Sequence, residues 1–144
     1  PRQALRLIEA LNAVKEEAWF TGLVSSAVRV RNILAKTEEG GETAPQEALL
    51  SKQAEQALWA EVQRLEAPVR EALGSYDWEK LTQLLSELSP VVSAFFDGVM
   101  VMDPDETVRA NRLALLRRCN ALFKEVGDLG TLTLKGAGKP QAKN

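Results

Sequence analysis

The apolar residues of this chain recur at every third or fourth position, the spacing of one helix face, without the sustained alternation that strands show. Residues 23–34 show the pattern clearly, with apolar side chains at Leu23, Ala27, Val30 and Leu34. Such a stripe is buried only when it packs against another helix. We therefore expect an all-α fold, a helical bundle of about five to seven helices with mostly short connections.

Breaker and cap residues divide the first half of the chain into predicted helices. The apolar stripes of residues 5–14 and 19–34 form either one bent helix or two, with Gly22 as a possible weak point. The first of these stripes consists of Leu5, Ile8, Leu11 and Val14. Residues 37–44 are rich in Thr, Glu and Gly and are expected to form a loop, after which Pro45 suits the first turn of the next helix.

Similar signals divide the second half of the chain. Pro68 is expected to kink or split the helix in which it lies, and Asp77 is expected to cap the helix that follows. The pairs Ser89–Pro90 and Asp103–Pro104 each predict a cap followed by the first residue of a helix. The last helix is expected to end near Val126, because glycines follow it.

The length and the distribution of residue types indicate one domain. A chain of 144 residues is long enough to bury a core of its own. We expect residues 1–130 to form this domain and residues 131–144 to be a flexible C-terminal tail. The chain begins without an initiator Met, and it shows neither a membrane-spanning run nor a secretory signal before its first helix. We therefore expect a piece of a longer cytoplasmic protein with no membrane partner.

The composition argues against a catalytic role for this chain. It contains no His, which removes the commonest general base and metal ligand, so its serines have no such base to activate them. Cys119 is the only cysteine, and its place on an apolar stripe favours burial over reactivity. No glycine-rich phosphate loop occurs. We expect no catalytic residue, no metal site and no cofactor in this fragment.

One face of the helix predicted within residues 19–34 is polar and basic. Its positions i, i+4, i+7 and i+11 are occupied by Ser25, Arg29, Asn32 and Lys36, without an acid, and Arg31 lies on the flank. Lys and Arg neutralise phosphates, and Arg and Asn also read base edges, so the stripe predicts an RNA contact. A solvated helix face, the more frequent situation, is the alternative interpretation. The net charge of −2 means that any RNA binding must come from such a local patch.

The last predicted helix carries a second group of cations, because residues 107–124 contain basic residues and no acid. Arg109 and Arg117 fall outside its apolar stripe and are further candidates for RNA contact. Arg112 falls within that stripe, and a buried guanidinium without a partner costs several kcal/mol. We expect Arg112 to form a structural ion pair with Asp97, at the end of the preceding helix.

The segments that carry these residues resemble a known family. Residues 95–102 read FFDGVMVM and residues 108–116 read VRANRLALL, and together they closely resemble the C-terminal end of bacterial glycyl-tRNA synthetase beta subunits. Residues 29–36 read RVRNILAK and resemble the segment of that family in the same order. Looser versions occur in arginyl-tRNA synthetases, and both families contain the DALR-type anticodon-binding domain, an all-α bundle. The resemblance covers about residues 5–129.

The resemblance implies a tRNA-binding function. Such a domain grips the anticodon stem-loop of glycine tRNA, within a beta subunit that forms a heterotetramer with a catalytic alpha subunit. That holoenzyme, and not this fragment, uses ATP to charge tRNA with glycine, and DNA is not an expected partner. Arg29, Asn32 and Lys36 match the family segment and are the first candidates for anticodon contact, whereas Arg112 matches as a structural residue. The alternative is a helical module that docks on the alpha subunit or its own parent chain, through an exposed patch around Trp59.

Overall fold

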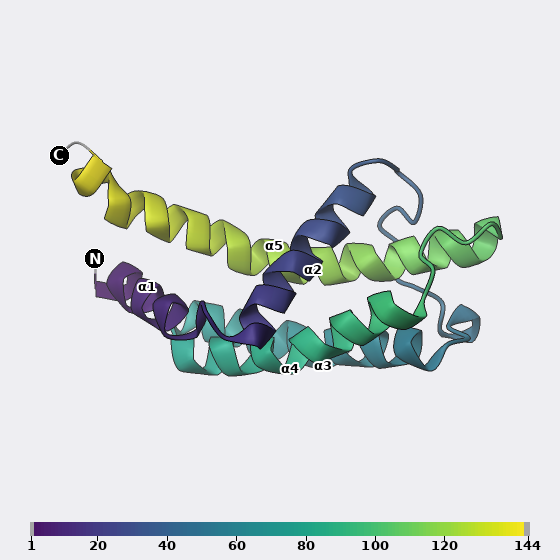
Figure 1. Cartoon of the computed structure of the whole chain (residues 1–144), viewed down its shortest axis with the longest axis horizontal. Coiled ribbons are helices and arrows are strands. Elements are labelled where there is room, and N and C mark those ends of the chain that lie inside the picture. The colour runs from purple at the N-terminus through teal and green to yellow at the C-terminus, as the bar shows by residue number, and fades with distance from the viewer. Residues whose placement is uncertain (1, 143–144) are drawn as a thin grey trace.

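The computed structural model describes the backbone of residues 2–142 and the side chains of residues 2–127. Over this range the fold is helical, which confirms the predicted all-α bundle (Figure 1). The elements are α1 (Arg2–Val14), α2 (Ala18–Leu34), the 3₁₀ helix η1 (Glu47–Leu49), α3 (Gln53–Gly74), α4 (Trp78–Gly98) and α5 (Glu106–Ala142). Within the described residues, no helix has the length and apolar character needed to cross a bilayer.

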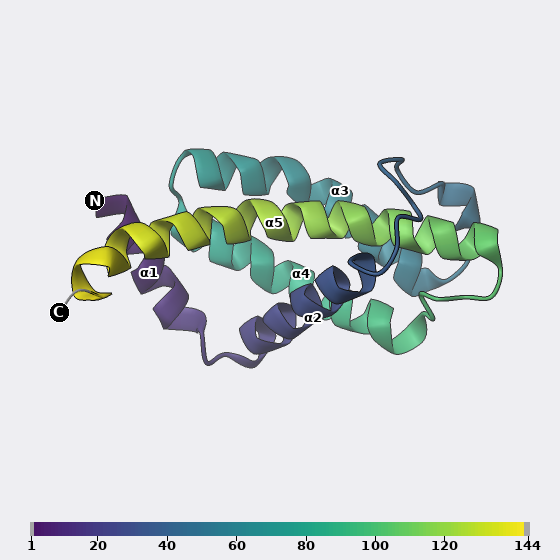
Figure 2. The same cartoon turned by 90° about the horizontal axis from the view of Figure 1, so that it is seen from above.

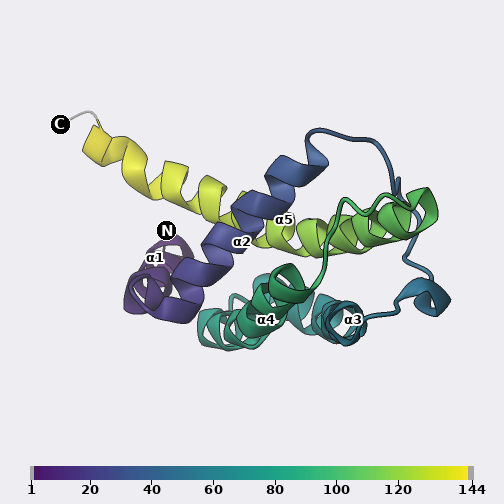
Figure 3. The same ribbon diagram turned by 45° about the vertical axis from the view of Figure 1, so that its right-hand side comes forward.

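The helices α3 and α4 form an antiparallel pair, and α5 lies along them (Figures 1 and 2). The helix α2 packs on α4 and crosses α5 (Figure 3). The N-terminal helix α1 packs against α4 and α5. The frame of α3, α4 and α5 therefore supports α2, whose outer side is left uncovered.

The core lies between α3, α4 and α5. Leu58 and Leu65 of α3, Leu88 and Phe95 of α4 and Leu115 of α5 are completely buried. Burial of one such side chain contributes about 1.5–3 kcal/mol, so this cluster supplies much of the free energy that holds the three helices together.

Cys119 of α5 belongs to the same core, as its place on the apolar stripe predicts. Burial raises the pKa of its thiol to about 12. We expect no reaction with a thiol reagent at about pH 8 until the chain unfolds, as measured by labelling across a urea titration. Because the folded state holds this proton more tightly than the unfolded state, the stabilisation is lost as pH rises above about 9. A smaller alkaline loss of stability in Cys119→Ala than in the wild type would confirm the assignment.

Two prolines lie inside helices that the sequence predicts to end or bend there. Pro68 lies within α3, and Pro90 lies within α4, so Ser89–Pro90 does not begin a new helix. An interior proline costs about 3 kcal/mol. Leu65 and Val69 flank Pro68 in α3 and are fully buried, which offsets that cost because each contributes about 2 kcal/mol. In α4, residues on both sides of Pro90 are equally buried, and their burial offsets the cost of this proline in the same way.

The break between the first two helices falls at residues 15–17, whereas Gly22 lies inside α2. A Cβ atom at Gly22 would lie 3.9 Å from Oγ of Ser89, so the small residue lies where α2 meets α4. Ser89 Oγ also donates a hydrogen bond of 2.7 Å to the carbonyl oxygen of Trp19. A Cβ atom there would make only ordinary van der Waals contact, and Gly22 does not break the helix in which it lies.

The buried face of α1 differs from the predicted stripe. Leu5 is 58 % exposed, while Leu7 is buried and Ala10 and Leu11 pack against the core. Apolar residues cover more than one face of this short helix, so the position of α4 and α5 decides which of them is buried. The prediction that Leu5 belongs to the core stripe is wrong.

The helix predicted to begin at Pro45 begins later. Pro45 is buried in the loop that follows α2. The 3₁₀ helix η1 comes next, and α3 starts only at Gln53. The capping interaction explains this start, because Glu55 Oε1 accepts a hydrogen bond of 3.2 Å from the backbone N–H of Lys52. The loop prediction for residues 37–44 is confirmed, and so is the Asp77 cap, whose Oδ1 accepts from the N–H of Lys80 at 3.1 Å.

The last helix continues past its predicted end. Gly127 does not take the left-handed conformation that ends a helix, and α5 extends to Ala142. A glycine inside a helix costs about 1 kcal/mol relative to alanine, so it weakens the helix without terminating it. The predicted end near Val126 is wrong. The division at residue 130 and the flexibility of residues 131–144 stay predictions, and residues 143 and 144 lie outside the described range.

Candidate nucleic-acid interface

One exposed stripe of α2 is polar, as the spacing of its residues predicts. Leu23, Val30 and Leu34 face the core and are buried. The opposite side exposes Ser25, Arg29, Asn32 and, in the turn after the helix, Lys36. These four residues are called the α2 ridge below. Their separations of four, three and four positions place them on one face, and the ridge runs toward the C-terminal end of α2.

The charges of the α2 ridge are not neutralised by neighbouring side chains. Among the side chains of residues 2–127, no carboxylate lies within 4.0 Å of Arg29, Arg31 or Lys36. Arg31 is exposed on the flank of the ridge. The surface therefore presents positive charge beside hydrogen-bonding neutral groups, which suits an anionic ligand.

Arg29 is held in place by an aromatic ring. Its guanidinium carbon lies 4.3 Å from the centroid of the Phe96 ring, at the C-terminal end of α4. A guanidinium stacked on a ring keeps its N–H donors directed outward in its own plane, so it remains able to bind a phosphate or a base. The contact joins residues 29–36 to residues 95–102, two segments that are far apart in the sequence.

The two candidate arginines of α5 are engaged with the loop between α2 and α3. Arg109 Nε donates to both carboxylate oxygens of Glu39 at 3.1 Å, and this hydrogen bond raises the pKa of Arg109. Arg117 donates to the backbone oxygens of Thr37 at 2.8 Å and Glu39 at 2.9 Å. Both arginines therefore hold the loop against α5.

Arg112 is buried in an ion pair, but its partner is not the one that the sequence predicts. Its Nε and Nη2 atoms each lie 3.2 Å from the carboxylate of Glu55, at the start of α3. Its Nη1 atom donates to the carbonyl oxygen of Met100 at 2.6 Å and to Asp103 Oδ2 at 3.4 Å. Asp97 is exposed on the last turn of α4, so the predicted Arg112–Asp97 pair is wrong.

A signal for Glu55 is present in the sequence. Glu55 lies on the same helix face as Leu58, Val62 and Leu65, and like them it is completely buried. A carboxylate on a buried stripe requires a cation on a facing stripe, which Arg112 supplies. A carboxylate within the apolar stripe of α3 and a guanidinium within that of α5 could together have identified the pair.

Asn111 is a further residue whose role becomes clear only in the structure. Its side-chain amide is buried, accepts from the N–H of Gln46 at 2.7 Å and donates to the carbonyl oxygen of Gln46 at 3.1 Å. This paired interaction satisfies both backbone groups of one loop residue. The polar residues of the segment 108–117 therefore fix the loop that follows α2.

The surroundings of Trp59 exclude the patch on which the docking alternative depended. Trp59 is only 6 % exposed, and the guanidinium carbon of Arg118 lies 5.1 Å from the centroid of its ring. Arg118 is itself paired with Glu66, with Nη2–Oε1 at 2.9 Å. The alternative docking function therefore lacks the exposed Trp59 on which its apolar patch would be centred.

Comparison with known protein families shows to which family this helical chain belongs. The DALR anticodon binding domain matches residues 23–131, a range that contains the α2 ridge, the Arg112–Glu55 pair and the Asn111 contact. The chain belongs to the DALR anticodon-binding domain family. In this DALR domain, α1 precedes the matched range.

Curated relatives of this DALR domain are glycine–tRNA ligase beta subunits. The protein from Chromohalobacter salexigens is 36 % identical over 132 residues, which is 92 % of this chain and 19 % of the relative. The protein from Anaeromyxobacter sp. (strain K) is 35 % identical over 139 residues, 96 % of this chain and 20 % of the relative. The protein from Shewanella sp. (strain MR-4) is 40 % identical over 125 residues, 87 % of this chain and 18 % of the relative. The chain thus spans about a fifth of the length of these relatives.

Proposed function

We propose that this chain is the anticodon-binding domain of a glycine–tRNA ligase beta subunit, and that the α2 ridge contacts the anticodon stem-loop of glycine tRNA. The observation that carries this proposal is a ridge of exposed cations without a carboxylate partner among the described side chains, inside the range matched by the family. The names of the relatives support the choice of glycine tRNA.

The chemistry of the ridge suits an RNA loop. Lys36 is an exposed point charge that can neutralise a phosphate, and Ser25 can donate to a phosphate oxygen. Asn32 can form paired hydrogen bonds with a base edge, and Arg29 can do so or stack on a base. Arg109 and Arg117 act indirectly in this proposal, because they hold the neighbouring loop.

The domain contributes binding and no chemical step. Contact with the anticodon end would position the tRNA so that its acceptor end reaches the alpha subunit, which would carry out the ATP-dependent charging with glycine in the cytoplasm. Binding at the anticodon would then hold the acceptor end near the alpha subunit, which is equivalent to a high local concentration of that end. The heterotetramer with the alpha subunit belongs to the same proposal.

Replacement of Arg29 tests the ridge. We expect Arg29→Ala to weaken binding of the glycine tRNA anticodon stem-loop by about 1–3 kcal/mol, roughly fivefold to over a hundredfold, because one base or phosphate contact is lost. Binding would be measured by fluorescence anisotropy over a series of salt concentrations. Arg29→Lys separates two roles: it retains the phosphate contact but loses stacking and bidentate hydrogen bonding.

A matched control is available on α4. Lys80 is exposed on the first turn of α4, at the other end of that helix from Phe96, and Lys80→Ala should leave the affinity within about twofold. Equal affinities of the wild type and Arg29→Ala would contradict the proposed contact, provided that circular dichroism shows the same helix content in both proteins.

A further inference from the structure

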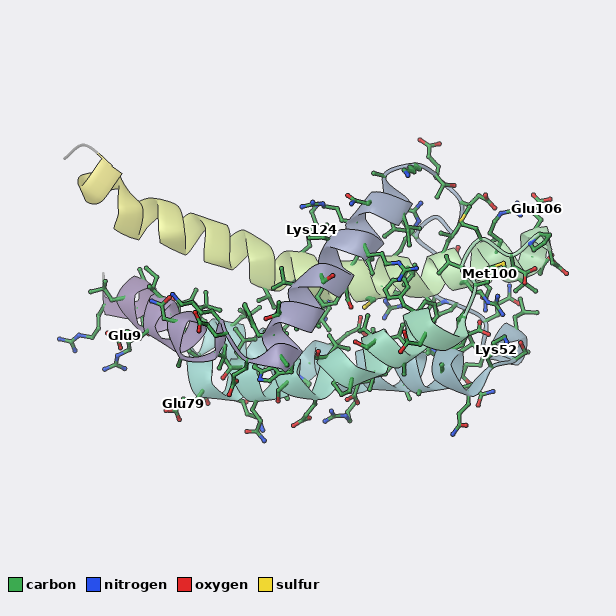
Figure 4. All side chains as sticks on the ribbon, viewed as in Figure 1. Glu9, Lys52, Glu79, Met100, Glu106 and Lys124 are labelled. Carbon is green, nitrogen blue, oxygen red and sulfur yellow. The ribbon has the colours of Figure 1, made fainter. Side chains whose placement is uncertain are left out.

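A cleft lies beside the C-terminal end of the α2 ridge, between the loop after α2 and the outer surface of α5. Its volume is about 450 Å³. One wall is formed by Leu34 and the loop residues 41–43, and the other by α5. Figure 4 shows Lys124 beside α2 at the point where α2 crosses α5. Lys36, the last residue of the ridge, follows Leu34 by two residues, so the end of the ridge and this wall of the cleft are adjacent in the chain.

The cleft carries an excess of positive charge. Among the described side chains, its lining includes the cations Arg117, Arg118 and Lys124, and a single anion, Glu42. Arg118 is paired with Glu66, which lies outside the lining. Arg117 is bonded to two neutral carbonyl oxygens and has no carboxylate within 4.0 Å among the described side chains, so its charge is not cancelled. The potential in the cleft therefore favours an anion.

The cleft also offers neutral hydrogen-bond donors. The side-chain amide of Asn120 lines it, one turn of α5 before Lys124. The hydroxyl of Thr43 also lines it, and its own hydrogen bond, to the carbonyl oxygen of Gly40, is long at 3.4 Å. An ammonium, an amide and a weakly bonded hydroxyl around one cavity match the oxygens of a phosphate group.

We propose that this cleft binds a backbone phosphate of the RNA that lies on the α2 ridge, with Lys124 as its principal ligand. This inference rests on the proposed function, because the ridge supplies the rest of the RNA contact. A phosphodiester is the chemistry that fits, since the site combines fixed positive charge with donors and its described side chains include no aromatic ring on which a base could stack.

The test compares Lys124→Ala, Glu42→Gln and the control Lys80→Ala in the whole 144-residue chain. The probes are the glycine tRNA anticodon stem-loop and a hairpin with the same stem and a scrambled loop. A phosphate contact carries no sequence information, so Lys124→Ala should weaken binding of both RNAs by about three- to tenfold and lower the salt slope by about 1. Glu42→Gln should tighten binding of both by about twofold, because it removes the anion of the cleft.

The outcomes separate this inference from the proposed function. If Lys124→Ala leaves the affinity and the salt slope unchanged while Arg29→Ala weakens binding, the phosphate site in the cleft is overturned and the proposed RNA contact of the α2 ridge stands. A loss of affinity in Lys124→Ala that is equal for both RNAs supports the phosphate site in the cleft. This holds even if the wild type binds both hairpins equally, a result that would contradict the proposed specificity for glycine tRNA. A loss confined to the glycine loop would also overturn the inference, because it would indicate base recognition at Lys124. Absence of binding to either hairpin at low salt would overturn both.

Discussion

Arg112→Ala is expected to destabilise this domain by about 3–5 kcal/mol, the effect of breaking a buried ion pair from one side. The carboxylate of Glu55 is completely inaccessible to solvent, and Arg112 is the cation bonded to it. After the substitution, no cation compensates the charge of this buried carboxylate, which costs free energy. The carbonyl oxygen of Met100 also loses its hydrogen bond of 2.6 Å. Because typical domains are stable by about 5–15 kcal/mol, urea denaturation should show a much lower midpoint.

Two controls make this expectation specific. Arg70→Ala removes an ion pair with Glu125 in which the arginine side chain is 62 % exposed, so it should cost less than about 1 kcal/mol. The double variant Glu55→Leu with Arg112→Met removes both charges and should recover much of the loss, because an apolar pair needs no compensation. A double variant as unstable as Arg112→Ala would show that the hydrogen bonds to the Met100 carbonyl and from the Lys52 N–H, and not the ion pair, dominate.

Gly40→Ala is expected to cost about 2–5 kcal/mol. The backbone of Gly40 has a φ of +86°, a conformation that costs a residue with a Cβ atom about 1–2 kcal/mol. The added Cβ would also lie 2.7 Å from the backbone nitrogen of Ala114 and 3.0 Å from the carbonyl carbon of Leu113. These atoms belong to the helix α5 and cannot move aside as a side chain can, so overpacking adds about 1–3 kcal/mol. Thermal unfolding monitored by circular dichroism would measure the sum.

The neighbouring glycine supplies the matched control. Gly41 also has a positive φ, of +49°, but a Cβ there would meet no atom within 4 Å. Gly41→Ala should therefore cost only about 1 kcal/mol, the backbone contribution alone. Equal losses in the two variants would mean that the close approach of the loop to α5 contributes nothing.

The consequences of Gly40→Ala should reach the binding surface. Gly40 lies next to Glu39, the residue that both Arg109 and Arg117 contact, and the same loop forms one wall of the cleft at Lys124. Movement of the loop away from α5 would change the position of these groups relative to the α2 ridge. Gly40 is therefore placed to couple the stability of the loop to the shape of the candidate interface.

The residues of the α2 ridge could be predicted from the sequence because their relation is internal to one helix. Periodicity alone places Ser25, Arg29, Asn32 and Lys36 opposite Leu23 and Leu34, and the structure has this arrangement. The Asp77 cap is equally local, because donor and acceptor are three residues apart. What the ridge binds is a separate matter, to which the family match contributes and which the Arg29 variants test.

Local signals failed where packing outweighed them. Proline at position 90 normally begins a helix, but the apolar residues on either side of it are buried in one continuous helix. Proline at position 45 also suits a helix start, but it lies buried in a loop that α5 holds in place. A local preference of about 3 kcal/mol or less is overcome when several buried side chains depend on another conformation.

The helical class of this chain and the polar face of α2 can be predicted from the order of its residues, because both follow from spacings of three and four positions. Which charges pair depends on the packing of separate helices and loops. Arg112 contacts Glu55 across 57 positions, Arg109 contacts Glu39 across 70, and Arg117 contacts Thr37 across 80. Periodicity identifies the face on which a charged side chain lies, but its partner depends on how separate helices and loops pack. Such pairing places Arg109 and Arg117 of α5 against the loop and leaves the α2 ridge exposed.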